Sequence, residues 1–315
     1  MEEHPPEDLA HLHVTAQTAA RLPGSERMQR IRGDRWIGYP RAVAALDRLE
    51  TLFEWPTTQR MPNLLLIGPT NNGKSMIIEK FRRQHPPSSG LDEEQIPVLT
   101  LQMPSDPSVI RFYVALLSAI GAPLRPRQRL ADLEQLALAL LRRVEVRMLV
   151  IDELHNVLAG RDSGSRREFL NLLRFLGNEL RIPLVGVGTR EAYLAIHSDA
   201  QLENRFEPIT LPLWVEGQET ASLLASFAAS FPLRSPSAIT TADTARYLLA
   251  RSEGTIGELT RLLTEAAVAA VDSGEEAEVL WCRTPDSLER LRANFTARGI
   301  PTTTLSLKTV PAPFP

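Results

Sequence analysis

The residues with the clearest chemistry follow a short apolar run at 64–67. Gly68 ends that run, and Gly73, Lys74 and Ser75 follow at the spacing G-x-x-x-x-G-K-[ST]. This is the phosphate loop, in which glycines let successive backbone N–H groups turn toward one anion. The alternative is a chance Gly-Lys-Ser turn, which the apolar strand before it and the apolar-faced helix after it disfavour.

Each polar residue of this loop has an expected task. We expect the Lys74 ammonium to reach the β- and γ-phosphates and the Ser75 hydroxyl to ligate Mg²⁺, while the following helix directs its positive end at the anion. The sequence therefore predicts ATP and Mg²⁺ as cofactors. The residues expected to bind the nucleotide here are Gly68, Pro69, Thr70, Asn71, Asn72, Gly73, Lys74, Ser75 and Met76.

A second apolar run, 147–151, ends in the adjacent acids Asp152 and Glu153. In phosphate-loop enzymes the first such acid holds Mg²⁺, and the next can act as general base toward a water. We therefore predict Asp152 as a metal partner and Glu153 as the catalytic carboxylate. The alternative is an ordinary strand end capped by solvated acids. His155 follows closely and is typical of a packing or orienting residue, so we assign it no catalytic role.

Thr189 follows the strand-like run 183–188. Its hydroxyl is predicted to orient the attacking water. It also stands where it would cap the next helix, 190–197, and the two roles are compatible.

Arg205 precedes the last strand expected in the core. Such an arginine can project across a subunit boundary onto a neighbour's γ-phosphate as an arginine finger, which makes it a predicted catalytic residue. A surface salt bridge with Glu203 or Glu207 explains the position equally well.

Strands alternating with helices must position these residues, and they predict an α/β fold with a doubly wound parallel sheet. Strands are expected at 63–67, 98–103, 147–151, 183–188 and 209–213, and helices at 40–52, 74–83, 108–120, 130–143, 165–180 and 190–197, with a loop at 85–90. Helices at 217–231, 240–251 and 256–272 then predict a small all-helical lid. The expected domains are a polar arm (1–35), a nucleotide-binding core (36–213), the lid (214–278) and a disordered tail (279–315).

The whole-chain composition narrows the class of protein. The 315 residues are 43% apolar and 23% charged, without an apolar run long enough to span a membrane. The N-terminus has no signal-peptide pattern, and Cys282 is the only cysteine, so we expect a cytoplasmic protein without disulfides. The net charge of −3 argues against a globally basic nucleic-acid binder, although a local arginine cluster remains compatible with DNA binding.

Taken together, the order of the motifs resembles that of the AAA+ ATPases. The amino-acid sequences of four segments are similar to TniB, a TnsC-like ATP-dependent target-selection subunit of bacterial transposons. These segments are Gly-Tyr-Pro-Arg-Ala at 38–42, Met-Pro-Asn-Leu-Leu-Leu-Ile-Gly-Pro-Thr-Asn-Asn-Gly-Lys-Ser at 61–75, Val-Ile-Asp-Glu-Leu-His-Asn-Val-Leu at 150–158 and Leu-Glu-Asn-Arg-Phe-Glu at 202–207. The resemblance covers about residues 1–275.

The resemblance implies an ATPase with slow, regulatory hydrolysis that assembles as a ring or filament on duplex DNA. It also implies three partners beyond the DNA itself, namely further copies of the chain, a DDE transposase of the TniA/TnsB type and a TniQ-like targeting protein. Lys74 and Ser75 match the Walker A positions, the two acids match Walker B, Thr189 matches sensor 1 and Arg205 the finger. Tyr39, in the segment 36–41, is placed where the family covers adenine.

Two positions depart from the AAA+ pattern. Where many members have a sensor 2 arginine in a Gly-x-x-Arg pattern, this chain has Gly257, and Arg261 lies one turn further on. The segment from about residue 279 does not match the family's end. A nucleotide-sensing scaffold with negligible hydrolysis and a helicase-loader-like remodeller therefore stay open as alternative functions.

Arg125, Arg127 and Arg129 alternate in a proline-containing loop and are the candidates for DNA contact. Loops of this kind can meet phosphates without reading sequence. A solvated surface loop is the alternative. Arg166 and Arg167, near the start of a predicted helix, form a second candidate, because positive charge there opposes the helix dipole.

Overall fold

The computed structural model of the chain describes residues 8–89, 94–106, 108–159 and 163–273. These residues form two compact units. The α/β unit contains residues 35–223 and 248–260, and the helical unit contains the described parts of 1–34, 224–247 and 261–315. The expected tail at 279–315 lies outside the described residues, and the domain limits given above stay predictions.

The α/β unit is built around a parallel sheet, which among the described residues has five strands in the order β4-β5-β6-β1-β7. The predicted α/β class with a parallel, doubly wound sheet is confirmed. The strands are β1 (Asn63–Ile67), β4 (Val98–Gln102), β5 (Met148–Asp152), β6 (Leu184–Gly188) and β7 (Phe206–Thr210). The helices of this unit are α3 (Pro40–Phe53), α4 (Lys74–Gln84), α5 (Val109–Ala119), α6 (Leu130–Arg143), the 3₁₀ helix η1 (Leu154–Ala159), α7 (Ser163–Leu180), α8 (Arg190–His197) and α9 (Ala200–Glu203).

Two sequence predictions about strands are wrong. The last core strand begins at Phe206, three residues before the expected start, because Pro208 does not prevent pairing on a strand that lies at the edge of the sheet. The segment 85–90 is also not all loop, since β2 (Ser88–Ser89) pairs antiparallel with β3 (Glu94–Gln95). Neither short strand has the apolar pattern that predicts a core strand.

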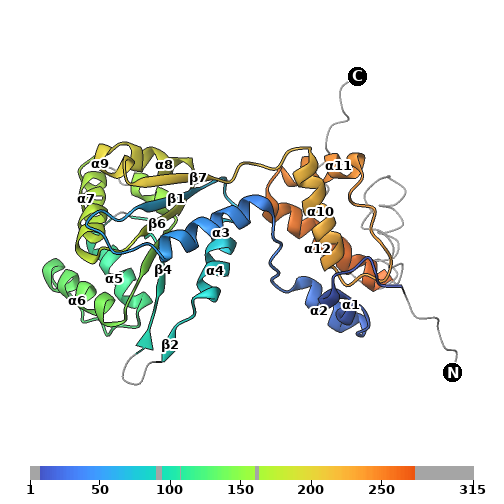
Figure 1. The fold of residues 1–315 in the computed structure, drawn as a ribbon, viewed down its shortest axis with the longest axis horizontal. Helices are drawn as coiled ribbons and strands as arrows, with labels where there is room; N and C mark the ends of the chain where they lie inside the picture. The colour runs from blue at the N-terminus through green and yellow to red at the C-terminus, as the bar shows by residue number, and fades with distance from the viewer. Residues whose placement is uncertain (1–7, 90–93, 107, 160–162, 274–315) are drawn as a thin grey trace. The chain divides into compact units, whose positions relative to one another are not determined.

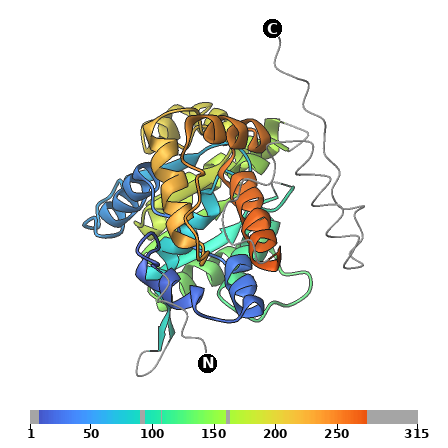
Figure 2. The same cartoon turned by 90° about the vertical axis from the view of Figure 1, so that its right-hand side faces the viewer.

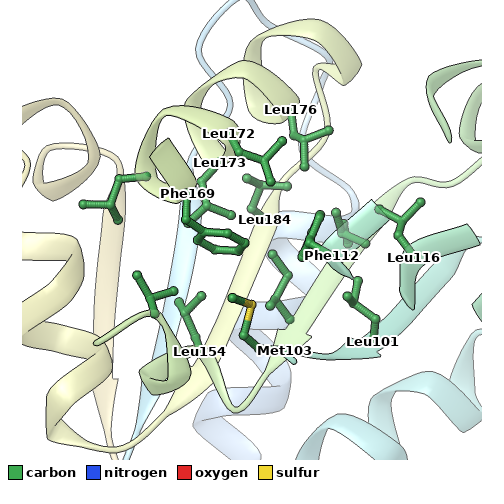
Figure 3. Packing of buried hydrophobic residues seen from close by; sticks show 14 of the residues in the cluster. Leu101, Met103, Phe112, Leu116, Leu154, Phe169, Leu172, Leu173, Leu176 and Leu184 are labelled. Carbon is green, nitrogen blue, oxygen red and sulfur yellow. The ribbon is translucent and has the colours of Figure 1, made fainter. Parts of the chain in front are cut away.

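Helices cover both faces of the main sheet, which explains why β1 is buried at every residue. In Figure 1, α3 and α4 lie on one face, where they contact β1 and β6. On the other face α5, α6, α7 and α8 pack into one large apolar cluster. Figure 3 shows this cluster, in which the Phe112 and Phe169 rings meet edge to face with centroids 5.3 Å apart.

The helical unit joins the two ends of the described chain. Its helices are α1 (Val14–Ala20), α2 (Gly24–Arg32) and parts of α10 (Gln218–Ser230), α11 (Ala242–Ser252) and α12 (Ile256–Ser273), since the division between the units falls within these three helices. The His13 N–H donates to the Ala229 carbonyl at 2.8 Å, and the buried Arg27 Nε donates to the Pro232 carbonyl at 3.0 Å. These two bonds link α1 and α2, the dark blue helices of Figure 2, to α10 and the segment directly after it.

Among the described residues, none of the helices combines the length and the apolar character of a membrane span.

Candidate nucleotide-binding site

The carboxyl ends of three neighbouring strands bring the predicted site residues together. Strands β1, β5 and β6 are parallel neighbours, and they end at Ile67, Asp152 and Gly188. The Gly68 N–H donates to the Gly188 carbonyl at 3.1 Å, which joins the start of the phosphate loop to the residue before Thr189. In open α/β sheets ligands bind at this edge.

The Lys74 side chain is buried beneath the phosphate loop, with 7% of the residue exposed. Its ammonium donates to the Gly68 carbonyl at 2.9 Å and to the Pro69 carbonyl at 2.7 Å. Burial lowers the pKa of Lys74 below its usual value, and the carboxylates of Asp152 and Glu153 act in the opposite direction. The ammonium is thus held in the loop by neutral carbonyls, which an anion can replace as its partners.

Gly73 precedes α4 in a left-handed conformation, with φ of +84°. A Cβ at this position would lie 3.2 Å from Ile256 Cγ2 and 3.5 Å from the Tyr39 hydroxyl. A side chain here would be strained by the backbone conformation and would crowd Ile256. The N-terminus of α4, which follows directly, is the end of a helix at which a phosphate group is expected to bind.

Ser75 and Asp152 meet although 77 residues separate them in sequence. The Ser75 hydroxyl donates to Asp152 Oδ2 at 2.8 Å. A hydroxyl and a carboxylate that converge in this way offer the oxygen ligands that Mg²⁺ prefers, so the residues present fit the predicted metal. Among the described residues there is no cluster of three His, Cys, Asp or Glu side chains that could hold a metal ion on its own.

Asn71 and Asn72 link the phosphate loop to the start of α12. The Asn71 carbonyl accepts from the Gly257 N–H at 2.9 Å, and its side chain donates to Glu258 Oε1 at 3.3 Å. Asn72 is 2% exposed, and its Oδ1 accepts from the Ile256 N–H at 3.3 Å. The sequence identified the asparagines as loop residues but gave no signal for this long-range partner.

The side chain of Asn71 lies so close to Gly257 that it accounts for a glycine at this position. A Cβ added there would stand 1.8 Å from Asn71 Oδ1, so any side chain at this position must displace the Asn71 side chain. An arginine at this position is incompatible with the arrangement in the structure. Arg261, the other candidate, pairs with Glu265 at 2.9 Å.

Tyr39 lies against the phosphate loop as one half of an aromatic pair. Its ring meets Trp214 edge to face with centroids 5.0 Å apart, and both residues are buried. Burial raises the pKa of Tyr39 to about 12, so its hydroxyl stays protonated and can donate. Tyr39 was predicted from the sequence, whereas Trp214 was not, because it belongs to no motif and reaches this place through the chain after β7.

Glu153 occupies an unusual backbone position at the end of β5. Its φ is +56°, and its N–H donates to Asp152 Oδ1 at 2.8 Å. A non-glycine residue in this region is uncommon and is found at functional sites more often than elsewhere. The carboxylate lies 3.0 Å from the Nε2 atom of His155.

Thr189 is the residue that directly follows β6 and precedes α8. Its hydroxyl donates to the Glu191 carboxylate and does not accept from the helix backbone, so it makes no side-chain capping bond. This bond is the main cause of a lowered pKa at Glu191. Thr189 is half-buried at the same sheet edge as Asp152, where the prediction of a water-orienting role requires it to be.

Arg205 is not part of this constellation. It directly precedes β7 and so lies at the amino ends of the strands, opposite to the carboxyl edge. Its carbonyl accepts from the Asn63 N–H at 2.9 Å. A five-residue strand separates the two edges, which is about 16 Å. Its guanidinium donates to Asn178 Oδ1 at 2.8 Å, while Glu203 pairs with His197 and Glu207 with Arg48. Arg205 therefore cannot serve its own site in this arrangement, and only the prediction of a finger toward a neighbouring subunit stays open.

The remaining predicted residues are accessible to solvent. Thr70 and Met76 are exposed beside the loop, whereas Pro69 is half-buried. Arg125, Arg127 and Arg129 are all exposed in the segment between α5 and α6, where Arg127 has a φ of +60°. Arg167 is exposed and Arg166 half-buried in the first turns of α7. Their contact with DNA stays a prediction.

Solved structures with the same fold belong to AAA+ proteins. The Aeropyrum pernix ORC1 protein in complex with DNA aligns with a TM-score of 0.53 at 17% identity, over 87% of this chain and 72% of that chain. The Aeropyrum pernix ORC2 protein, in ADPNP–ADP complexes, gives 0.51 at 15% identity over 88% and 74%. CDC6P from Pyrobaculum aerophilum gives 0.52 at 14% identity over 79% and 67%. At such identities the likeness shows the AAA+ fold alone.

No curated protein is significantly similar to the chain in sequence. A match to a protein family is nevertheless clear, and it includes the phosphate loop, both acids, Thr189 and Arg205. The model of the bacterial TniB protein family matches residues 27–216, more than half of the chain, and the chain therefore belongs to the TniB family.

Proposed function

We propose that the protein is an ATP-dependent regulator of DNA transposition, which binds and hydrolyses ATP with Mg²⁺ at the carboxyl edge of its sheet. The observation that carries this proposal is the hydrogen bond of 2.8 Å between Ser75 and Asp152, with Glu153 directly beside it. It unites the phosphate loop with the acid pair, as metal-dependent hydrolysis at a phosphate loop requires.

Each side chain of the site has a separate proposed task in binding or hydrolysing ATP. Lys74 and the backbone N–H groups at the start of α4 bind the phosphates, and the buried Tyr39 bounds the loop on the side of Gly73. A Mg²⁺ ion held by Ser75 and Asp152 would neutralise charge that develops on the phosphates. Glu153 accepts the proton of the attacking water.

Lys74→Ala and Glu153→Gln test this proposal together. Lys74→Ala should abolish nucleotide binding, measured by titration with a fluorescent ATP analogue. Glu153→Gln should retain binding and lower kcat about a hundredfold or more, because it removes the general base. Unchanged nucleotide affinity in Lys74→Ala, or equal turnover in wild type and Glu153→Gln, would contradict the proposal.

The proposed role in transposition rests on membership of the TniB family. Nucleotide-bound copies would assemble on duplex DNA and present a surface to a DDE transposase and a TniQ-like targeting protein. The exposed Arg125, Arg127 and Arg129 would meet DNA phosphates, with an affinity that falls as salt rises.

Electron microscopy with duplex DNA and a non-hydrolysable ATP analogue examines the assembly step. We expect rings or filaments on the DNA, and free monomers at low salt would contradict assembly. Replacing the three arginines by alanine should weaken DNA binding and flatten its salt dependence, while leaving nucleotide affinity unchanged.

A nucleotide-sensing scaffold with negligible hydrolysis is the second candidate. It is favoured by Gly257, which stands where many AAA+ proteins have the arginine that couples nucleotide to the lid. The Glu153→Gln comparison separates the two, because a scaffold would assemble with ATP but show no turnover that the substitution can lower.

A further inference from the structure

The first turn of α12 finds its hydrogen-bond acceptors in the phosphate loop. The first N–H groups of a helix have no acceptor within the helix itself. In α12 the Ile256 N–H donates to Asn72 Oδ1 at 3.3 Å, and the Gly257 N–H donates to the Asn71 carbonyl at 2.9 Å. Thr255, directly before the helix, donates its hydroxyl to the last carbonyl of α11 at 3.0 Å. The phosphate loop therefore caps a helix that begins 184 residues further along the chain.

The Asn72 side chain joins this cap to a third segment. Its Nδ2 donates to the Leu211 carbonyl at 2.9 Å and to the Pro212 carbonyl at 3.0 Å, directly after β7. The Leu211 N–H in turn donates to the carbonyl of Ile67, the last residue of β1, at 2.8 Å. Asn72 is 2% exposed, so water does not compete for these bonds. One amide thus holds together the phosphate loop, the chain after β7 and the start of α12.

The peptide group between Asn71 and Asn72 can bind a partner at each end. Its carbonyl accepts from the Gly257 N–H, while its N–H, which belongs to Asn72, has no acceptor within the described part of the chain. Backbone N–H groups of a phosphate loop are the expected donors to a bound phosphate. The N–H and C=O of one peptide group are conjugated, and hydrogen bonds in a chain polarise one another. A phosphate at the Asn72 N–H would therefore strengthen the bond from the Asn71 carbonyl to Gly257.

Gly257 leaves α12 without the arginine that many AAA+ proteins have at this place. We propose that the Asn71–Asn72 peptide group, positioned by the Asn72 side chain, couples a bound phosphate to the first turn of α12 and so takes over the task of that arginine. This inference rests on the proposed nucleotide binding. The coupling is reciprocal, so an intact cap also tightens nucleotide binding. The affected turn belongs to the helix that begins in the α/β unit and continues in the helical unit.

Hydrogen–deuterium exchange on the peptide that contains Ile256 and Gly257 tests the coupling directly. In wild type, a saturating non-hydrolysable ATP analogue with Mg²⁺ should slow exchange of these two N–H groups about fivefold or more, the usual range of coupling between sites. In Asn72→Ala, at a concentration that saturates the variant, the slowing should fall below about twofold. The affinity of Asn72→Ala for the analogue should fall by about the factor that the slowing loses, because the coupling is reciprocal.

Two controls make the result specific. Asn156→Ala removes an asparagine bond of the same kind, from Asn156 Nδ2 to the Met103 carbonyl at 3.1 Å, outside the cap. This variant should keep both the slowing and the nucleotide affinity of wild type. Exchange in α6, measured in the same samples, reports the general stabilisation that any bound ligand provides, and it should change less than exchange at the start of α12.

The outcomes distinguish this inference from the proposed function. A wild type without affinity for the analogue overturns both. A wild type that binds and hydrolyses ATP, but shows no slowing at Ile256 and Gly257 beyond that in α6, overturns the coupling alone. Slowing that persists in Asn72→Ala, or that is lost equally in Asn156→Ala, also overturns it. If Asn72→Ala does not fold, Asn72→Ser decides in its place, because its hydroxyl ends one bond short of both amide atoms.

Discussion

The carboxyl edge of the sheet holds Ser75 and Asp152 in one hydrogen bond between accessible side chains, whereas the amino edge is closed around Asn63. Asn63 is 4% exposed, its Oδ1 accepts from the Leu184 N–H at 2.9 Å, and its N–H donates to the Arg205 carbonyl at 2.9 Å. One residue thus joins β1, β6 and β7. Groups at the carboxyl edge can exchange their partners for a ligand, but those at the amino edge cannot without opening the sheet.

Arg205→Ala should have the largest effect, because Arg205 lies at the amino edge of the sheet but is predicted to act in catalysis on a neighbouring subunit. In the DNA-bound assembly we expect Arg205→Ala to lower kcat about a thousandfold, since an arginine finger stabilises charge in the transition state. In unassembled protein the substitution should leave kcat unchanged. ATP turnover with and without duplex DNA measures both.

Mixing two inactive variants shows whether Arg205 acts on a neighbour. Arg205→Ala supplies an intact Glu153, and Glu153→Gln supplies an intact Arg205, so mixed assemblies contain some complete sites. Turnover in the mixture above that of either variant alone is the expected result. A mixture without recovery contradicts the finger.

Asn63→Ala tests whether the amino edge of the sheet has a purely structural role. The buried Leu184 N–H would lose its acceptor, which costs about 1–3 kcal/mol in the free energy of unfolding. Turnover per folded molecule should not change. Urea unfolding with Asn204→Ala as the matched control, an exposed side chain that donates to Ala200, should show a loss below about 0.5 kcal/mol for the control. Equal losses would contradict the special role of Asn63.

Gly257→Ala tests the link between the phosphate loop and α12. The added methyl must displace Asn71, and we expect nucleotide affinity to fall about tenfold, at the low end of the cost of overpacking. Gly177→Ala, in α7, is the control, because its Cβ would make an ordinary contact of 3.6 Å with Leu184. Titration with a fluorescent nucleotide measures both, and an unchanged affinity in Gly257→Ala would contradict the link.

Glu79→Gln, in α4, should give the smallest effect, a change in how the free energy of unfolding depends on pH. Hydrogen bonds from Arg82 and Arg83 lower the pKa of Glu79 to about 2. Because the folded-state value is depressed, this contribution to stability is present above pH of about 4.5 and is lost as pH falls toward 2. The group is solvent-accessible, so Glu79→Gln should remove only a few tenths of a kcal/mol of this pH dependence. Thermal unfolding at pH 7 and pH 3 measures the difference.

Much of the α/β unit could be predicted because its signals are local. The strand 63–67 and the helices 130–143 and 190–197 have the bounds that their apolar periods predict. The start of strand β7 was predicted three residues too late. This strand is stabilised by pairing with β1, while its own sequence contains Pro208. A single sequence does not state which partner a strand will find.

The phosphate loop, the acid pair and the α/β alternation can be read from the amino-acid sequence alone, since each depends on spacing within a few residues of chain. The folded arrangement was needed to show that Ser75 meets Asp152, that Gly257 abuts Asn71, that His155 lies near Glu153 and that Arg205 lies at the opposite edge. These relations arise from strand order and from the close approach of backbones at glycines. Both are properties of packing between segments that lie far apart in the chain.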